Sequence, residues 1–130
     1  MKHLIFLLLV LSPQLWAARN SDIDIKKLEN QRAFIGQLNQ CVNPNQLDEF
    51  IKKAIQNTSD YETRSKYAGV LEELIKYNPS CFIASINKLD NINCRQIEDA
   101  YINEPHFYPR EDLRNSLRKT KDFSKSCLAV

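Results

Sequence analysis

Apolar residues recur at helical spacing along most of this chain. The clearest stripe is Leu47, Phe50, Ile51, Ala54 and Ile55, at positions i, i+3, i+4, i+7 and i+8, which places all of them on one face of a helix. No segment alternates apolar and polar residues for long enough to indicate a β-strand, and only 2 of the 130 residues are glycine. The pattern therefore predicts an all-α fold.

Residues that can cap a helix stand ahead of further apolar stripes. Asn43-Pro44 and Asn78-Pro79 each combine a capping side chain with a proline suited to the first helical position. Ser59-Asp60-Tyr61-Glu62 has the spacing of a capping box, Asn93 is expected to cap a later helix, and Pro109 to begin the last one. We predict a compact, disulfide-stabilised bundle of about five to six short helices, and stacked helical hairpins are one arrangement that fits.

The N-terminal residues have the order of a secretory signal peptide. Lys2 gives a basic start, Leu4–Leu11 is an apolar run, and Ala17 offers a small residue before a cleavage site. The run is too short for a membrane anchor, because spanning a bilayer takes about 20 apolar residues. We therefore expect an exported protein from which residues 1–17 are removed, leaving residues 18–130 as a single helical domain.

All four cysteines, Cys41, Cys81, Cys94 and Cys127, lie in the expected mature part. An even number of cysteines in an exported chain indicates disulfides. Three pairings are possible, and we favour Cys41–Cys81 with Cys94–Cys127. A zinc site is the alternative, but it needs close ligand pairs such as C-x-x-C, which are missing here. We expect no metal and no other cofactor.

The overall charge is close to neutral once the signal peptide is removed. Without Lys2, 17 of the 18 basic residues remain against 16 acidic ones. This balance gives no basis for nucleic acid binding. The sequence also has no second long apolar run, so we expect no stable membrane insertion.

Basic residues repeat along the last predicted helix. Arg110, Arg114, Arg118, Lys121 and Lys125 are spaced by four and three positions, which places them on one side of a continuous helix. This side could meet an acidic protein, anionic lipid or cell-wall polymer, or it could be only the solvated face of the helix. If it binds a protein, the charge favours an acidic toxin or effector.

The segment YINEPHFYPRED, residues 101–112, contains three aromatic rings and two prolines. Pro105 and Pro109 restrict the backbone, so the segment is expected to form a rigid corner between two helices. One ring could fill the end of the bundle, or the rings could form a contact patch with few rotatable bonds. The contact candidates on the corner and the following helix are Tyr101, His106, Phe107, Tyr108, Arg110 and Arg114.

No catalytic constellation is recognisable in the sequence. His106 would need a nucleophile or a second metal ligand, and Glu104 alone supplies neither. The carboxylates of Glu72-Glu73 and Asp48-Glu49 are neighbours along a helix, so they point in different directions instead of facing each other across a cleft. We therefore interpret His106 as a surface histidine and expect no enzymatic activity.

The C-terminal half has a distinctive order of short motifs. It reads YAGVLEELIKYNPSCFIASINKL from Tyr67, then INC, then YINEP, and its last helix ends in SKSCLAV. Over residues 67–128 this order resembles a loose group of small, mostly uncharacterised exported proteins of Gram-negative bacteria. The resemblance implies an all-helical exported fold and pairing of Cys94 with Cys127, and it implies no particular activity.

The sequence favours an exported protein, periplasmic or extracellular, that binds another protein and catalyses no reaction. Small disulfide-bonded helical proteins of the periplasm include immunity proteins, and by analogy we expect an inhibitor or immunity protein against a secreted toxin. A carrier of small apolar ligands is one alternative, and a less favoured one is a cell-envelope enzyme. The sequence does not specify the oligomeric state.

Overall fold

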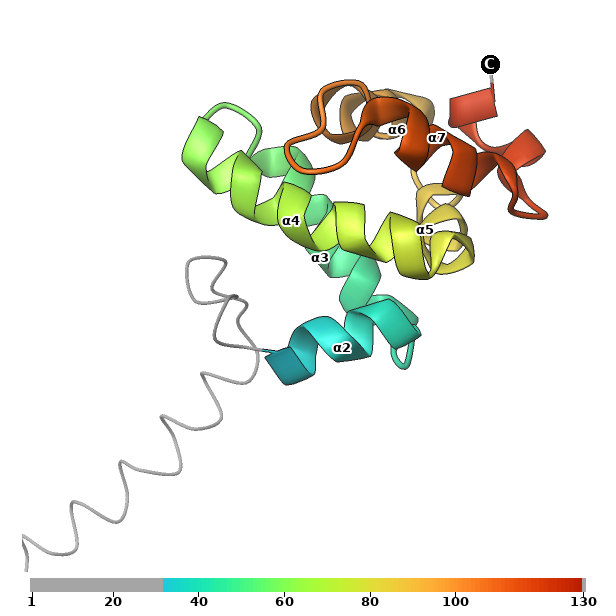
Figure 1. Cartoon of the computed structure of the whole chain (residues 1–130), viewed down its shortest axis with the longest axis horizontal. Coiled ribbons are helices and arrows are strands. Elements are labelled where there is room, and N and C mark those ends of the chain that lie inside the picture. The colour runs from blue at the N-terminus through green and yellow to red at the C-terminus, as the bar shows by residue number, and fades with distance from the viewer. Residues whose placement is uncertain (1–31, 130) are drawn as a thin grey trace, which may run out of the picture.

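A computed structural model describes residues 32–129, and these residues form an all-α fold (Figure 1). The predicted fold class is confirmed for this part of the chain, whereas the predicted signal peptide lies outside it. The elements are α2 (Arg32–Gln40), α3 (Pro44–Gln56), α4 (Tyr61–Tyr77), α5 (Pro79–Ile86), α6 (Asn91–Ile97), the π-helical turn η2 (Glu98–Ile102), α7 (Arg110–Arg118) and the 3-10 turns η3 (Phe123–Lys125) and η4 (Cys127–Ala129).

Two asparagines cap helices as the sequence predicts. The Asn43 side chain accepts a hydrogen bond from the backbone N–H of Asn45 (3.1 Å), and the Asn78 side chain accepts one from Cys81 (3.3 Å). In both helices a proline occupies the start of the first turn, where its missing N–H costs nothing. The beginnings of α3 and α5 therefore follow from local sequence.

Two other caps differ from the prediction, because an aspartate takes the position. Asp60, not Ser59, caps α4 by accepting the N–H of Thr63 (3.0 Å). Asp90 caps α6 by accepting the N–H of Asn93 (2.7 Å), so Asn93 lies inside the first turn. A carboxylate is the stronger acceptor at a helix N-terminus, where the helix dipole also favours negative charge.

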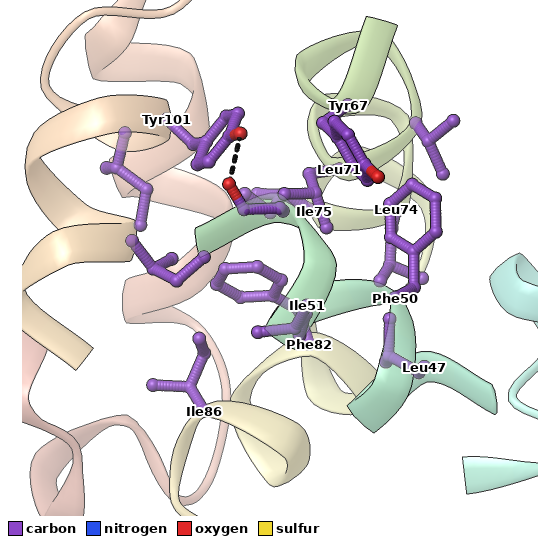
Figure 2. Packing of buried hydrophobic residues seen from close by; sticks show 14 of the residues in the cluster. Leu47, Phe50, Ile51, Tyr67, Leu71, Leu74, Ile75, Phe82, Ile86 and Tyr101 are labelled. Atoms are coloured by element: carbon purple, nitrogen blue, oxygen red, sulfur yellow. Dashed lines mark hydrogen bonds between the residues drawn. The ribbon is translucent and has the colours of Figure 1, made fainter. Parts of the chain in front are cut away.

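Helix α4 lies at the centre of the fold. It packs against α2 and α5 and, on another side, against α7 and η2, while α3 packs against α5 and α6 (Figure 1). The apolar stripe predicted for α3 is buried in this core, and each large side chain there stabilises the fold by about 1.5–3 kcal/mol. Figure 2 shows the centre of the core, formed by Leu47, Phe50, Ile51, Tyr67, Leu71, Leu74, Ile75, Phe82, Ile86 and Tyr101.

The two predicted disulfides are present. Cys41–Cys81 joins the end of α2 to the start of α5, and Cys94–Cys127 joins α6 to η4, with Cα atoms 6.0 and 6.3 Å apart. Disulfides persist in non-reducing surroundings, so the pairing indicates an exported protein. Within residues 32–129, none of the helices has the length and apolar composition needed to cross a membrane.

Candidate docking surface on α4

The corner segment, residues 103–109, connects η2 to α7 and lies against α4 (Figure 1). It is held there by the carboxylate of Glu72, a fully buried residue of α4. One carboxylate oxygen accepts the backbone N–H of His106 (2.7 Å), and the other accepts those of Phe107 (3.0 Å) and Tyr108 (2.8 Å). These three consecutive N–H groups would otherwise be unpaired against a helix, so Glu72 fixes the backbone of the corner segment.

The role of Glu72 was not predicted from the sequence, where Glu72 stands out only as half of a carboxylate pair with Glu73. The structure separates the two residues, because Glu72 is buried and Glu73 is exposed. A signal was present in the sequence: Glu72 follows Leu71 and precedes Leu74 on the inner face of a predicted helix. A carboxylate on such a face needs donors, and a corner without regular hydrogen bonding can supply them.

Aromatic side chains of the corner segment lie along the face of α4 that carries Glu72. The His106 ring is 5.0 Å from the Tyr61 ring and 6.2 Å from the Phe107 ring, between centroids. The ammonium group of Lys76 is 5.6 Å from the centre of the Tyr108 ring. We call Tyr61, His106, Phe107 and Tyr108 the aromatic surface.

Two rings of the aromatic surface are exposed to solvent. Tyr61 is 67% exposed and Phe107 is 63% exposed, whereas His106 and Tyr108 are half-buried. The Phe107 ring edge lies beside Gly69, where an added Cβ would be 3.5 Å from it. Large exposed rings on a fixed backbone are characteristic of contact surfaces.

His106 is more enclosed than the predicted surface histidine. Both of its ring nitrogens are shielded from solvent, and neither has a hydrogen-bond partner among residues 32–129. A general base needs a ring nitrogen within reach of a substrate proton. In this conformation the ring of His106 packs beside Tyr61 and Phe107, and its nitrogens face away from solvent.

The prediction that Tyr101 lies at a contact surface is wrong. Its side chain is fully buried, and its hydroxyl group donates a hydrogen bond to the backbone carbonyl of Ala54 (2.7 Å; Figure 2). Burial raises the pKa of Tyr101 well above its ordinary value of 10.0, with Tyr67 adding to the effect. Tyr101 belongs to the core, because the helical spacing that it shares with Cys94 and Ile97 carries it inward.

Arg114 is engaged within the molecule. Its guanidinium donates hydrogen bonds to the Glu98 carboxylate (3.3 Å) and to the side-chain oxygen of Asn103. Arg95 donates to the other oxygen of Glu98 (2.7 Å), so one largely buried carboxylate joins α6, η2 and α7. Arg114 therefore positions the corner segment, and of the two predicted arginine contacts only Arg110 is exposed.

The predicted basic face is not continuous, because α7 ends at Arg118. The Thr120 hydroxyl donates to the carbonyl of Leu117 (2.8 Å), and the chain then turns into η3 and η4, so Lys121 and Lys125 lie beyond the helix. Two of the remaining charges are also paired with acids. Arg118 lies 3.7 Å from Glu111, and Lys125 lies 3.7 Å from Asp122.

A polar hollow of about 370 Å³ lies next to the aromatic surface. Arg64 connects the two, because it lines the hollow and its guanidinium carbon is 5.7 Å from the centre of the Tyr61 ring. Asp99 and Glu104 contribute exposed carboxylates to the same hollow. The described residues of the lining come from the loop before α4, from α4, α6 and η2, and from the corner segment: Thr58, Arg64, Gln96, Asp99, Ala100 and Glu104.

Comparisons of the chain with protein-family models, curated proteins and solved structures found no match. The resemblance to small exported proteins of Gram-negative bacteria therefore stays a prediction. The candidate site is a set of aromatic rings on a backbone that Glu72 fixes, beside a polar hollow.

Proposed function

We propose that this protein binds another protein through the aromatic surface and acts as an inhibitor or immunity protein, without catalysing a reaction. The observation that supports the proposal is the exposure of Tyr61 (67%) and Phe107 (63%) on a backbone that Glu72 holds in place. Most large apolar side chains of the described residues are buried, so the placement of these two rings side by side with His106 needs an explanation.

The construction of the surface favours tight binding. Tyrosine and phenylalanine bring a large contact area with only two rotatable side-chain bonds each, so little conformational entropy is lost when a partner covers them. The corner segment is already ordered by three hydrogen bonds to Glu72 and by Pro105 and Pro109. A preordered backbone lowers the cost of association further.

Three observations favour the periplasm as the place of action. The two disulfides require a non-reducing compartment. Residues 1–17 have the order of a signal peptide, and the resemblance over residues 67–128 is to exported proteins of Gram-negative bacteria. In that compartment, a small cross-linked binding domain suits the inhibition of a secreted toxin.

Capture of partners from periplasmic extract by the mature, oxidised protein tests the proposal. Tyr61→Ala and Phe107→Ala should each weaken binding of the captured protein by about tenfold or more, as expected for central aromatic contacts. Ile92→Ala is the matched control, because Ile92 is 73% exposed on α6 and lies outside the aromatic surface. Equal binding by all three variants, or recovery of no specific protein, would contradict the proposal.

A further inference from the structure

We infer that the partner contacts the aromatic surface with a basic segment, which places an arginine or lysine side chain in the polar hollow beside Tyr61. This inference rests on the proposed function and names the chemistry of the partner. It follows from the charges in the hollow, from the side chains that line it, and from the ion pairs that engage several basic residues of the C-terminal part of the chain.

The side chains of the hollow that remain available for an ion pair are negative. Glu104 is exposed and makes no hydrogen bond or ion pair with any described residue, and Asp99 accepts a hydrogen bond only from the neutral amide of Asn103 (3.2 Å). Among the described residues of the lining, Arg64 is the one cation, and its guanidinium already lies over the Tyr61 ring. A cation that enters the hollow meets two carboxylates and one guanidinium, so the excess of negative charge favours it over an anion.

The lining also suits the rest of a long basic side chain. Ala100 offers an apolar wall for the aliphatic stem, and the exposed Tyr61 ring lies beneath the guanidinium of Arg64 at the border of the hollow. Gln96 and Thr58 supply neutral oxygens that can accept further N–H groups. Arginine fits better than lysine, because its planar group can donate to two carboxylates at once.

The inferred charge of the partner is opposite to the sequence-based expectation. That expectation of an acidic partner depended on a continuous basic helix face. The face is interrupted after Arg118, and the side chains of Arg114, Arg118 and Lys125 are paired with Glu98, Glu111 and Asp122. Arg110 and Lys121 are exposed, but neither lines the hollow next to Tyr61, where the carboxylates of Asp99 and Glu104 outnumber the single guanidinium of Arg64.

Titration of the mature, oxidised protein with two synthetic peptides, followed by amide chemical shifts, tests the inference directly. The peptides are acetyl-Leu-Arg-Leu-amide and acetyl-Leu-Glu-Leu-amide, which differ only in the central residue, and this residue carries opposite charge in the two. At low salt, the arginine peptide should shift the amides of Tyr61, Asp99 and Glu104 and should bind at least about fivefold more tightly than the glutamate peptide. Raising the salt concentration should reduce this difference.

Two variants assign the effect to the hollow. Asp99→Asn combined with Glu104→Gln keeps the shape of the lining and should weaken binding of the arginine peptide about three- to tenfold. Glu111→Gln, which removes an exposed carboxylate on α7 that pairs with Arg118, should leave binding unchanged. Equal or tighter binding of the glutamate peptide, the absence of shifts at residues 99–104 up to about 20 mM peptide, or an equal effect of Glu111→Gln would overturn the inference.

The outcomes separate this inference from the proposed function. The captured partner could require Tyr61 and Phe107 for binding but bind the double carboxylate variant as tightly as the wild type. That result would support the aromatic surface as the binding site and would contradict the inference that the partner is basic. Chito-oligosaccharides could shift the same amides, in the wild type and in the double variant alike, while the arginine peptide shifts none. The hollow would then be a glycan site, and the inference would be wrong. If Tyr61→Ala and Phe107→Ala leave partner binding unchanged, the proposed function fails first.

Discussion

At the scale of single residues, the backbone of the corner segment depends on one carboxylate. Glu72→Gln keeps the length of the side chain but removes its charge and leaves one accepting oxygen for three N–H groups. We expect this substitution to lower the free energy of unfolding by about 2–3 kcal/mol, because buried N–H groups lose charged acceptors. Urea denaturation of the mature, oxidised protein at pH 7 measures the change.

Glu73→Gln is the control for this prediction. Glu73 is adjacent in sequence but exposed, and no hydrogen bond to the corner segment depends on it. Its substitution should change the free energy of unfolding by less than about 0.5 kcal/mol. If the two variants unfold at the same urea concentration, Glu72 does not hold the corner segment in the way that the structure indicates.

The buried hydroxyl group of Tyr101 gives a second prediction at this scale, and it concerns alkaline pH. Because burial raises the pKa of Tyr101 above 10.0, the folded protein keeps the proton that the unfolded chain releases near that value. The stabilisation is complete below pH 10 and is lost as the pH rises above it. Tyr101→Phe should cost about 1 kcal/mol at pH 7, through loss of the hydrogen bond to Ala54.

The pH dependence provides the diagnostic measurement. Above pH 10 the wild type should lose stability more steeply than Tyr101→Phe, so thermal unfolding curves of the two proteins should converge as the pH rises. Tyr61→Phe is the matched control, because the Tyr61 ring is 67% exposed, and its pH profile should follow that of the wild type. A Tyr101→Phe profile parallel to the wild type would contradict the burial of this hydroxyl group.

The role of a single residue could be predicted from the sequence only where its hydrogen-bond partner lies nearby along the chain. Asn43 and Asn78 cap N–H groups two and three positions along the chain, so local spacing was sufficient. Glu72 accepts hydrogen bonds from donors 34 to 36 positions away, and no local pattern specifies that distance. For the same reason His106 was expected at the surface, because its enclosure by Tyr61 depends on how the corner segment folds back.

At the scale of elements, α3 and α5 are joined by a polar link as well as by the core. The Asp48 carboxylate accepts hydrogen bonds from Ser85 (2.5 Å) and Lys88 (2.9 Å). Partial burial alone would raise the pKa of Asp48, but these hydrogen bonds and the charge of Lys88 outweigh it, so the pKa lies below the ordinary 3.8. Asp48 therefore contributes stability that is present above pH 3.8 and is lost as the pH falls below that value.

Asp48→Asn tests this link. At pH 7 the variant should be less stable than the wild type by about 1–2 kcal/mol, because a charged acceptor is replaced by a neutral one. Below pH 4 the difference should shrink, since the wild type then loses its own charge. Glu49→Gln, an exposed substitution next to it, should show neither effect. A stability difference that stays constant from pH 7 to pH 3 would show that the Asp48 charge is not involved.

The predictability of the elements was also uneven. The starts of α3 and α5 follow from an asparagine and a proline, which act locally. The end of α7 at Arg118 does not follow from a local signal; beyond it the Cys94–Cys127 disulfide and the buried side chain of Leu128 hold the C-terminal turns against the fold. The basic stripe was misassigned for this reason: periodic charge predicts a face only while the helix continues.

At the scale of the whole molecule, the two disulfides stabilise different parts of the fold. Cys41–Cys81 closes a separation of 40 residues and fixes α2 to α5, while Cys94–Cys127 closes 33 residues and fixes the C-terminal turns to α6. By the chain-entropy argument each contributes about 4 kcal/mol, mostly by restricting the unfolded chain. Loss of either disulfide should therefore lower the free energy of unfolding by a similar amount. The effects on binding should differ, because the two disulfides anchor different elements.

Replacement of each pair by serine tests this difference. Cys41→Ser with Cys81→Ser, and Cys94→Ser with Cys127→Ser, should each lower the urea midpoint substantially. Only the replacement of Cys94 and Cys127 should also weaken binding of the arginine peptide, by about threefold or more. The reason is that α6 leads directly into η2 and contributes Gln96 to the lining of the polar hollow. Suppose that the variant without Cys41–Cys81 is still folded and binds the arginine peptide as weakly as the other variant does. The hollow would then depend on global stability and not on the local anchoring of α6. Amide chemical shifts of α4, recorded without peptide, distinguish folded from unfolded protein in that comparison.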